Sequence, residues 1–382
     1  MTTSRRHFAR CLASAAAAAF WLIAAPSASP AQTSARSDSS FAALVARLSE
    51  SGGYFDSDNI ITNEASYLQI ASQLAKQRVR GGVYIGVGPD QNFSYIALIH
   101  PRIAFMLDVR RDNMLEHLLF KSLFALSRNR MEYLCLLFGK RVPPDVDQWA
   151  PRDITDILAY VSRSATDSAS AAATRKASND RITALGVALD ERDRKMIDRY
   201  RDEFISSGLD TRYSSLGRNN RMDYPSFQQL ALATDREGRR ASYLAEESAF
   251  QFVRSMQASG RIVPVVGNVA GDKAVRAIAQ YATETHEHVS AFYLSNVEQY
   301  LMGREGGFDA YAKNVKLLPH DSSGVIIRSY FGRLGLWHPL YLPAAGNLST
   351  SMIEPIQSFV TRFDAGEIHT YSDLVFHGFV TP

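Results

Sequence analysis

The segment Gly82–Asp112 constrains the fold more than any other stretch of the chain. It begins with a short apolar run, Val83–Val87, continues with a stretch of helical length, Gln91–His100, and ends with a second apolar run, Ile103–Leu107. Asp108 follows that run directly. A strand, a glycine turn, a helix and a strand with an acid at its tip form the mononucleotide-binding half of a doubly wound α/β fold.

The turn between the first strand and the helix contains Gly86 and Gly88. Glycine adopts positive φ and lets a ligand approach the backbone, and the following helix offers unpaired N–H groups. Asp108 lies twenty residues beyond Gly88, where a carboxylate can bind both ribose hydroxyls. We therefore predict a nucleoside site. The alternative is a glycine-containing strand end, with Asp108 capping a helix that starts near Arg111.

The residues after the turn indicate which kind of nucleoside binds. A dinucleotide fingerprint has a third glycine where this chain has Asp90 and Gln91. The anionic Asp90 would repel phosphate at a helix N-terminus, so a ribose with a cationic or zwitterionic tail fits better. S-adenosylmethionine is the predicted cofactor, and Asp90 and Asn92 join the glycines and Asp108 as its candidate contacts.

The alternation of strands and helices resumes after residue 258. Apolar runs at Arg261–Val266, Val289–Leu294 and Val325–Ser329 are separated by helical stretches, a pattern that predicts a mostly parallel sheet. Polar residues at the carboxyl ends of such strands face the ligand crevice. These second candidates are Asn268, Ser295 and Asn296 for the cofactor and Asn296 and Glu298 for catalysis; each has the alternative role of a turn or cap residue.

Residues 1–31 predict an export signal. Ser4–Phe8 has the twin-arginine pattern, and Leu12–Ala25 is an alanine-rich apolar stretch followed by small residues before Gln32. The apolar stretch is short for a membrane-spanning helix, although a membrane anchor is the alternative. We expect the mature protein in the periplasm or outside the cell, with no membrane span.

Charge and cysteine content argue against a nucleic-acid-binding protein and against a disulfide-stabilised one. The signal contains three of the 42 basic residues and no acid, so the mature chain has 39 basic and 39 acidic residues. A neutral chain gives no electrostatic footprint for nucleic acid. Only Cys135 remains after removal of the signal, so no internal disulfide is possible.

We divide the mature chain into three parts. Residues 32–139 contain an N-terminal segment and the first half of the Rossmann-like domain, 140–258 form a mainly helical insertion, and 259–382 form the second half. Within the insertion, the Ser/Ala-rich Val161–Asp180 predicts a flexible or weakly helical segment. In the tail, Ile353–Phe363 and Tyr371–Phe376 predict a last helix and a last strand.

The segment before the first strand offers a cover for the ligand. Asn63, Glu64 and Tyr67 are its candidate contacts, because this part of such folds often lies over the ligand; the alternative is that Asn63 caps a helix. No metal site is predicted, since His286 and His288 lack a third ligand in the sequence. The chain also has no GxSxG elbow and no P-loop.

Four stretches, YIGVGPDQNF, FMLDVRRDN, IVPVVGNVAG and AFYLSNVEQYL, resemble an uncharacterised bacterial protein family with a class I S-adenosylmethionine-dependent methyltransferase-like fold. The resemblance covers most of residues 55–330. It implies a glycine turn at Gly86 and Gly88, a ribose acid at Asp108 and a fourth strand ending at Ser295 and Asn296. In that superfamily an acid usually precedes the first glycine motif and a third glycine ends it; here Tyr84 and Asp90 occupy those positions.

Two functions are compatible with these features. The first is S-adenosylmethionine-dependent transfer to an unknown acceptor, which depends mainly on positioning and does not require an obvious base. The second is a non-catalytic periplasmic protein that binds a small molecule or a partner on the same scaffold. Export favours the second, because the cofactor is made in the cytoplasm.

Overall fold

The fold is described from a computed structural model, which covers residues 40–57, 59–215, 224–332, 338–341 and 348–382. The predicted export signal, residues 1–31, lies outside these ranges. Within them, no helix has both the length and the apolar character needed to cross a membrane.

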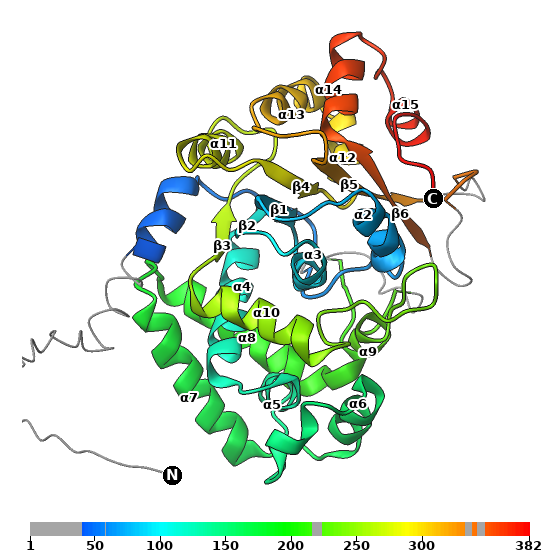
Figure 1. Cartoon of the computed structure of the whole chain (residues 1–382). Coiled ribbons are helices and arrows are strands. Elements are labelled where there is room, and N and C mark those ends of the chain that lie inside the picture. Colours follow the sequence, from blue (N-terminus) through cyan, green and yellow to red (C-terminus); the bar gives the residue numbers. More distant parts are fainter. Residues whose placement is uncertain (1–39, 58, 216–223, 333–337, 342–347) are drawn as a thin grey trace, which may run out of the picture.

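A six-stranded sheet in the order β3-β2-β1-β4-β5-β6 forms the centre of the molecule (Figure 1). All neighbouring strands are parallel except β6, which is antiparallel to β5. The order is that of doubly wound nucleotide-binding folds, and the predicted Rossmann-like α/β class is confirmed. The strands are β1 (Val83–Val87), β2 (Ile103–Asp108), β3 (Ile262–Val266), β4 (Val289–Tyr293), β5 (Val325–Phe331) and β6 (Ser349–Pro355).

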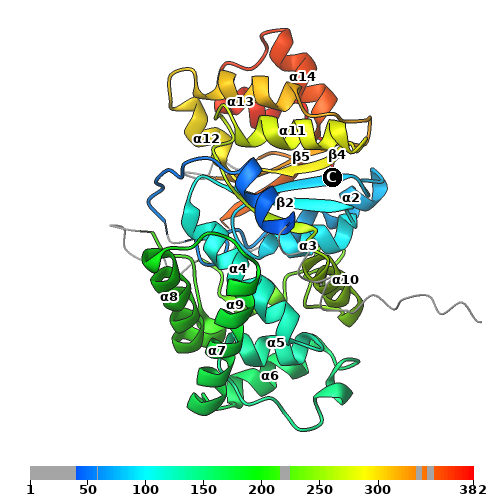
Figure 2. The ribbon, with the colours of Figure 1, turned by 90° about the vertical axis from the view of Figure 1, so that its left-hand side faces the viewer.

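Helices cover both faces of the sheet (Figure 2). This burial explains why the parallel strands are continuous apolar runs rather than alternating ones. One face carries α11 (Ala274–Glu284), α13 (Gly307–Lys316) and α14 (Ile356–Asp364), and the other carries α3 (Gln91–Ile99), α4 (Arg111–Leu126) and α10 (Glu247–Ala258). The shorter helices are η1 (Tyr67–Ile70), α2 (Ala71–Lys76), α12 (Val297–Met302) and α15 (Tyr371–Phe376).

The region 140–258 is helical wherever helices or strands are assigned in its described part. It packs beyond α4, which contacts β2 and β3 on one side and α7 and α8 on the other. Figure 2 shows this helical layer on the side of α3 and α4. Its elements, with the preceding α5 (Arg130–Leu137), are η2 (Val146–Trp149), α6 (Ile154–Arg163), α7 (Ser168–Ala184), α8 (Glu191–Ser207), η3 (Gly208–Asp210) and α9 (Phe227–Ala231).

Of the two interpretations of Val161–Asp180, flexible or weakly helical, the structure supports a helix, and a regular one. Most of this segment belongs to α7, a regular helix of 17 residues that begins at the N-cap Asp167. The Asp167 carboxylate accepts hydrogen bonds from the amides of Ala169 and Ser170, both at 3.1 Å. The small residues that suggested flexibility allow α7 to pack closely on α4.

The prediction of a closing strand at Tyr371–Phe376 is wrong, because these residues form the helix α15. Thr370 and Asp373 make a capping box at its start, which satisfies the first helical amides. The strand that closes the sheet is instead β6, which precedes α14 and pairs with β5 from Val325↔Pro355 to Phe331↔Ser349.

Candidate functional site

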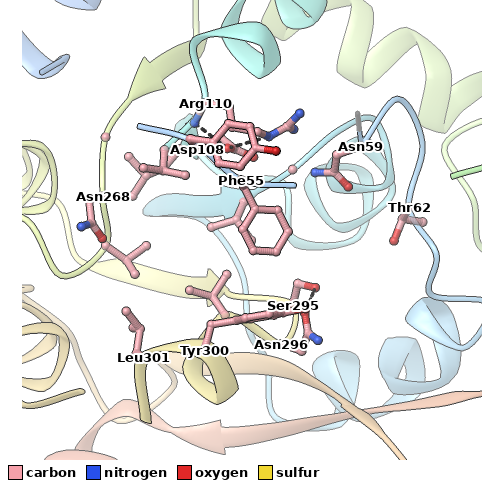
Figure 3. Close-up of a pocket in the computed structure, with 18 of the residues that line it drawn as sticks. Phe55, Asn59, Thr62, Asp108, Arg110, Asn268, Ser295, Asn296, Tyr300 and Leu301 are labelled. Carbon is pink, nitrogen blue, oxygen red and sulfur yellow. Dashed lines mark hydrogen bonds and ion pairs between the residues drawn. The ribbon is translucent and has the colours of Figure 1, made fainter. Parts of the chain in front are cut away.

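A cavity of about 160 Å³ lies at the carboxyl ends of β1, β2, β3 and β4 (Figure 3). The strand order reverses between β1 and β4, and ligands of open α/β sheets bind at such a switch point. The predicted residues that line it are Gly88, Asp108, Asn268, Ser295 and Asn296. Other parts of the wall come from the segment before β1, from the start of α3, from Val109 and Arg110 after β2, from Tyr213, and from α12 and the turn that follows it.

Asp108 is held at the tip of β2 by the next turn of chain. Its Oδ1 atom accepts a hydrogen bond from the amide of Arg110 at 2.8 Å and lies 3.5 Å from the Arg110 Nε atom. Among the residues that the structure describes, none donates a hydrogen bond to its Oδ2 atom. The carboxylate is therefore fixed, one oxygen remains available to a ligand, and the alternative that Asp108 caps α4 does not hold, since Arg110 is the N-cap.

The glycine turn has two parts with different tasks. Gly88 lines the cavity and has φ +82°, which favours glycine. Gly86 and Asn92 lie outside the cavity wall. Asn92 shapes the turn from behind, because its Nδ2 atom donates to the carbonyls of Val87 at 2.9 Å and Pro89 at 2.8 Å.

The turn after β4 has an unusual backbone. Ser295 has φ +55°, the left-handed region that is uncommon for a residue with a side chain. Its carbonyl accepts a hydrogen bond from the Ser329 amide at 2.7 Å, so β5 fixes the conformation. Strained residues of this kind cluster at functional sites. Asn296, the N-cap of α12, follows it in the cavity wall.

Asn268 reaches the cavity from the turn after β3. Its side-chain Oδ1 atom accepts a hydrogen bond from the Ala270 backbone amide at 2.9 Å. Its backbone amide donates to Glu50 Oε1 at 2.7 Å. The Gly267 amide donates to the Asp108 carbonyl at 2.8 Å. These bonds hold the β2 and β3 turns together and place Asn268 and Asp108 in one wall.

Two further predicted residues, Asp90 and Glu298, also lie outside the cavity wall. Asp90 is buried on the far side of the turn, where its carboxylate accepts a hydrogen bond from Tyr243 at 3.2 Å, and burial raises its pKa to about 7. Glu298 is absent from the described cavity wall; its carboxylate binds Arg328 at 2.7 Å and accepts from Tyr311 at 2.8 Å. An acid bound in a buried ion pair is a structural group, so Glu298 does not serve as the catalytic candidate that its position suggested.

The segment before β1 contributes part of the wall. Asn63 lines the cavity and does not cap a helix, because η1 begins after Ser66. Glu64 is buried beneath the cavity, and Tyr67 points away from it and donates to the Leu230 carbonyl at 3.2 Å. The part of this segment that lines the cavity thus lies mostly before Glu64, at Tyr54, Phe55, Asn59, Thr62 and Asn63.

Aromatic residues that the sequence analysis did not select surround the mouth. Phe55 and Tyr300 meet edge to face, with ring centroids 5.1 Å apart, and Tyr54 is 74% exposed beside them. Figure 3 shows the Phe55 ring between Asp108 of β2 and Tyr300 of α12. Their signal in the sequence is weak, since single aromatic residues in loops are common. Such rings offer stacking surfaces to a planar ligand and exclude water.

The cavity is built for recognition more than for acid–base chemistry. Of the described lining residues, Asp108 is the one acid, and the cations Arg110 and Arg304 accompany it. No group of three or more His, Cys, Asp or Glu residues in the described ranges could hold a metal ion. The wall can bind hydroxyl, amide and aromatic groups of a small ligand.

Comparison with known families gives one match. The family described as Domain of unknown function (DUF7790) matches residues 59–143 and 157–376. The matched stretches include the glycine turn, Asp108 and the turns after β3 and β4, so the match covers both halves of the cavity. No curated protein matches the chain.

Proposed function

The chain belongs to the DUF7790 family, and we propose that the cavity at the carboxyl end of its sheet binds a nucleoside ligand. S-adenosylmethionine is the proposed cofactor, and transfer of its methyl group to an acceptor is the proposed activity. The resemblance to class I methyltransferase-like folds supports this choice of nucleoside. The twin-arginine pattern supports a periplasmic or secreted location.

The observation that carries the proposal is the position of Asp108. It stands at the tip of β2 beside the switch point, where folds of this strand order place the carboxylate that binds ribose. Arg110 engages only Oδ1 of this carboxylate, and Oδ2 remains to accept a ribose hydroxyl. A carboxylate that accepts such bonds contributes more than a neutral acceptor.

The start of α3 argues against a dinucleotide. A pyrophosphate would need the amides at that N-terminus and close approach of the backbone, but Asp90 is buried there as the N-cap residue. The amides of Asn92 and Phe93 at this helix start donate to the carbonyls of Pro89 and Asp90 at 3.4 and 2.9 Å, so they are already used within the turn. A nucleoside without phosphate avoids this conflict.

The lining residues fit the proposed cofactor in the following roles. Asp108 would bind the ribose, Gly88 would allow close approach of the ligand, and Phe55 with Tyr300 would cover it and exclude water. Asn296 would orient the acceptor through its amide. The cofactor supplies an electrophilic methyl group on a positively charged sulfur, and holding it against an acceptor provides most of the rate enhancement that such transfer needs.

A binding protein without transfer activity is the second candidate. The observation that favours it is the loss of Glu298 as a catalytic acid or base, since that carboxylate is bound to Arg328. Limited supply of the cofactor outside the cytoplasm points the same way. Both candidates share the nucleoside site, so binding is tested first.

In calorimetric titration, the Asp108→Asn variant should bind S-adenosylmethionine and S-adenosylhomocysteine about 10- to 100-fold more weakly than the wild type. The amide keeps the size of the side chain but removes the charge that strengthens bonds to ribose hydroxyls. Asp272→Asn is the matched control, because that carboxylate is 97% exposed and lies outside the cavity wall.

If the folded wild-type protein binds neither ligand at millimolar concentration, the nucleoside proposal is refuted. Binding that Asp108→Asn does not weaken would move the site away from this cavity. Binding followed by no methyl transfer to any acceptor class tested would favour the second candidate.

A further inference from the structure

Glu64 is a buried carboxylate that has no cationic partner in the part of the chain that the structure describes. Its side chain is fully buried, and it forms no ion pair with any residue in the described ranges. Three hydroxyl groups donate to it instead: Tyr293 at 2.9 Å, Ser295 and Ser329. Hydroxyl groups can solvate a carboxylate, but they do not neutralise its charge, and burial of an uncompensated charge is costly.

The carboxylate is connected directly to the cavity. Ser295 lines the cavity wall, and its Oγ atom donates to Glu64 Oε1. A second connection runs through Gln91, which also lines the wall and whose Nε2 atom donates to the Tyr293 hydroxyl at 3.3 Å. A ligand that contacts Ser295 therefore lies one hydroxyl group away from the carboxylate.

Within the described residues, the surroundings of Glu64 provide no other counter-charge. The titratable groups that interact with it are the tyrosines Tyr84 of β1, Tyr95 of α3, Tyr293 of β4 and Tyr371 of α15. Burial raises the pKa of each of these hydroxyl groups, so they stay neutral. Nearby arginines are engaged or solvated: Arg110 is held by Asp108, Arg328 by Glu298 and Glu354, and Arg304 is exposed.

We infer that Glu64 is the counter-charge for a cationic group of the ligand. The ligand contacts Ser295, whose hydroxyl is hydrogen-bonded to Glu64. The inference rests on the nucleoside site proposed above and specifies the class of ligand, a nucleoside with a sulfonium or ammonium group at the β4 side. The Ser295 hydroxyl donates a hydrogen bond to Glu64, which makes its oxygen a better acceptor toward the cavity. Glu64 acts on the ligand through Ser295 and is a positioning residue.

Ligand charge and protonation of Glu64 are coupled in this arrangement. Burial raises the pKa of Glu64, and the bonds from Ser295, Ser329 and Tyr293 lower it, with burial the larger effect. A cation in the cavity favours the ionised form, so it lowers this pKa and releases a proton wherever Glu64 was protonated before binding. The affinity for a cationic ligand should therefore rise as pH rises through the pKa of Glu64 in the free protein.

The test compares three ligands that differ in charge at one position. S-adenosylmethionine carries a sulfonium, sinefungin carries an ammonium, and S-adenosylhomocysteine carries a neutral thioether; all three have the same α-amino and carboxyl groups. Titrations are run at several pH values in buffers of different ionisation enthalpy, which gives the number of protons released. We expect both cationic ligands to bind at least about tenfold more tightly than the thioether. Proton release should accompany binding of the cationic ligands only.

The Glu64→Gln variant should lose both the charge preference and the proton release while still binding S-adenosylhomocysteine. Asp90 is a second buried carboxyl group whose pKa is raised by burial, to about 7, so Asp90→Asn is the companion variant, and in it the proton release should persist. If circular dichroism shows that Glu64→Gln does not fold, the comparison of the three ligands on the wild-type protein tests the inference by itself.

The outcomes separate this inference from the proposed function. Binding of all three ligands with equal affinity and no proton release would overturn the role of Glu64 and leave the nucleoside site intact. Proton release that survives in folded Glu64→Gln would overturn it as well. Absence of binding by all three ligands would overturn the nucleoside site and, with it, this inference.

Discussion

Replacing Arg328 with methionine should lower the free energy of unfolding by about 3–5 kcal/mol, the usual loss when one partner of a buried ion pair is removed. Arg328 is fully buried on β5. Its Nε atom lies 2.7 Å from Glu298, and its Nη1 atom lies 2.6 Å from Glu354. The variant would leave two carboxylates in the interior without the cation between them. Arg362 would still bind Glu354 at 2.9 Å, but Glu298 would keep only the hydroxyl of Tyr311.

The loss should depend on pH. Burial lowers the pKa of Arg328, but the carboxylates of Glu298 and Glu354 outweigh burial, and the net pKa lies above the ordinary value. The guanidinium is therefore charged throughout the accessible range, and the variant removes a full positive charge. Protonation can neutralise the carboxylates left behind, so we expect the deficit to shrink as the pH falls toward the range in which carboxyl groups bind protons.

Urea unfolding at several pH values measures this deficit. Arg199→Met is the matched control, because Arg199 is exposed on α8 and forms no ion pair with any described residue. That change should stay within about 0.5 kcal/mol. Equal losses in the two variants would mean that the network contributes little to stability. A deficit in Arg328→Met that does not vary with pH would mean that unpaired carboxylates are not its cause.

This network also explains why the sequence misplaced Glu298. Its position at the carboxyl end of a strand predicts a role in the ligand crevice, and that rule is local. The partners Arg328 and Glu354 belong to β5 and β6, and their approach depends on the packing of the sheet edge against α12. The sequence around position 298 does not contain that information. A carboxylate that stabilises the fold through an ion pair therefore could not be distinguished from one that contacts a ligand.

The elements of the sheet were predictable because each parallel strand is buried on both faces. Val83–Val87 and Ile103–Asp108 are recognisable as continuous apolar runs. Tyr371–Phe376 also contains mostly apolar residues, but the capping box of Thr370 and Asp373 makes it a helix. A short apolar run does not distinguish a strand from a buried helix, and here a pair of polar residues decided between them.

The cavity was predictable to the extent that strand ends determine it. Asp108, Asn268 and Ser295 follow three different strands, and a parallel sheet brings such ends together. Phe55 and Glu64 belong instead to the irregular segment before β1, whose path over the sheet depends on tertiary contacts. The sequence analysis identified this segment as a cover and selected Glu64 as a ligand contact, whereas the structure buries Glu64 behind Ser295. It missed Phe55, the aromatic ring at the mouth.

Replacing Gly86 with alanine should lower the free energy of unfolding by about 2–3 kcal/mol, the loss typical of an overpacked interior. A Cβ atom at this position would lie 1.9 Å from Asn92 Oδ1 and 2.7 Å from the ring of Tyr84. Asn92 cannot move aside without cost, because its Nδ2 atom bonds the carbonyls of Val87 and Pro89 at 2.9 and 2.8 Å. The clash would therefore reach the turn that contains Gly88.

This effect distinguishes two explanations for the first glycine of the motif. A glycine required for ligand approach would affect binding and leave the free protein as stable as before. A glycine required for internal packing would lower the urea midpoint without ligand, and weaker binding would follow from a distorted turn. The structure predicts the second result, because Gly86 lies outside the cavity wall and faces Asn92.

Gly303→Ala is the control, since Gly303 has φ −82° and its nearest neighbour would lie 3.6 Å from the new Cβ atom. Alanine at such a position should leave stability unchanged or raise it by about 0.4–1 kcal/mol. If Gly86→Ala were as stable as this control but bound the nucleoside more weakly, the first glycine would serve the ligand directly. The loop would then have to rearrange on binding so that position 86 joins the cavity wall.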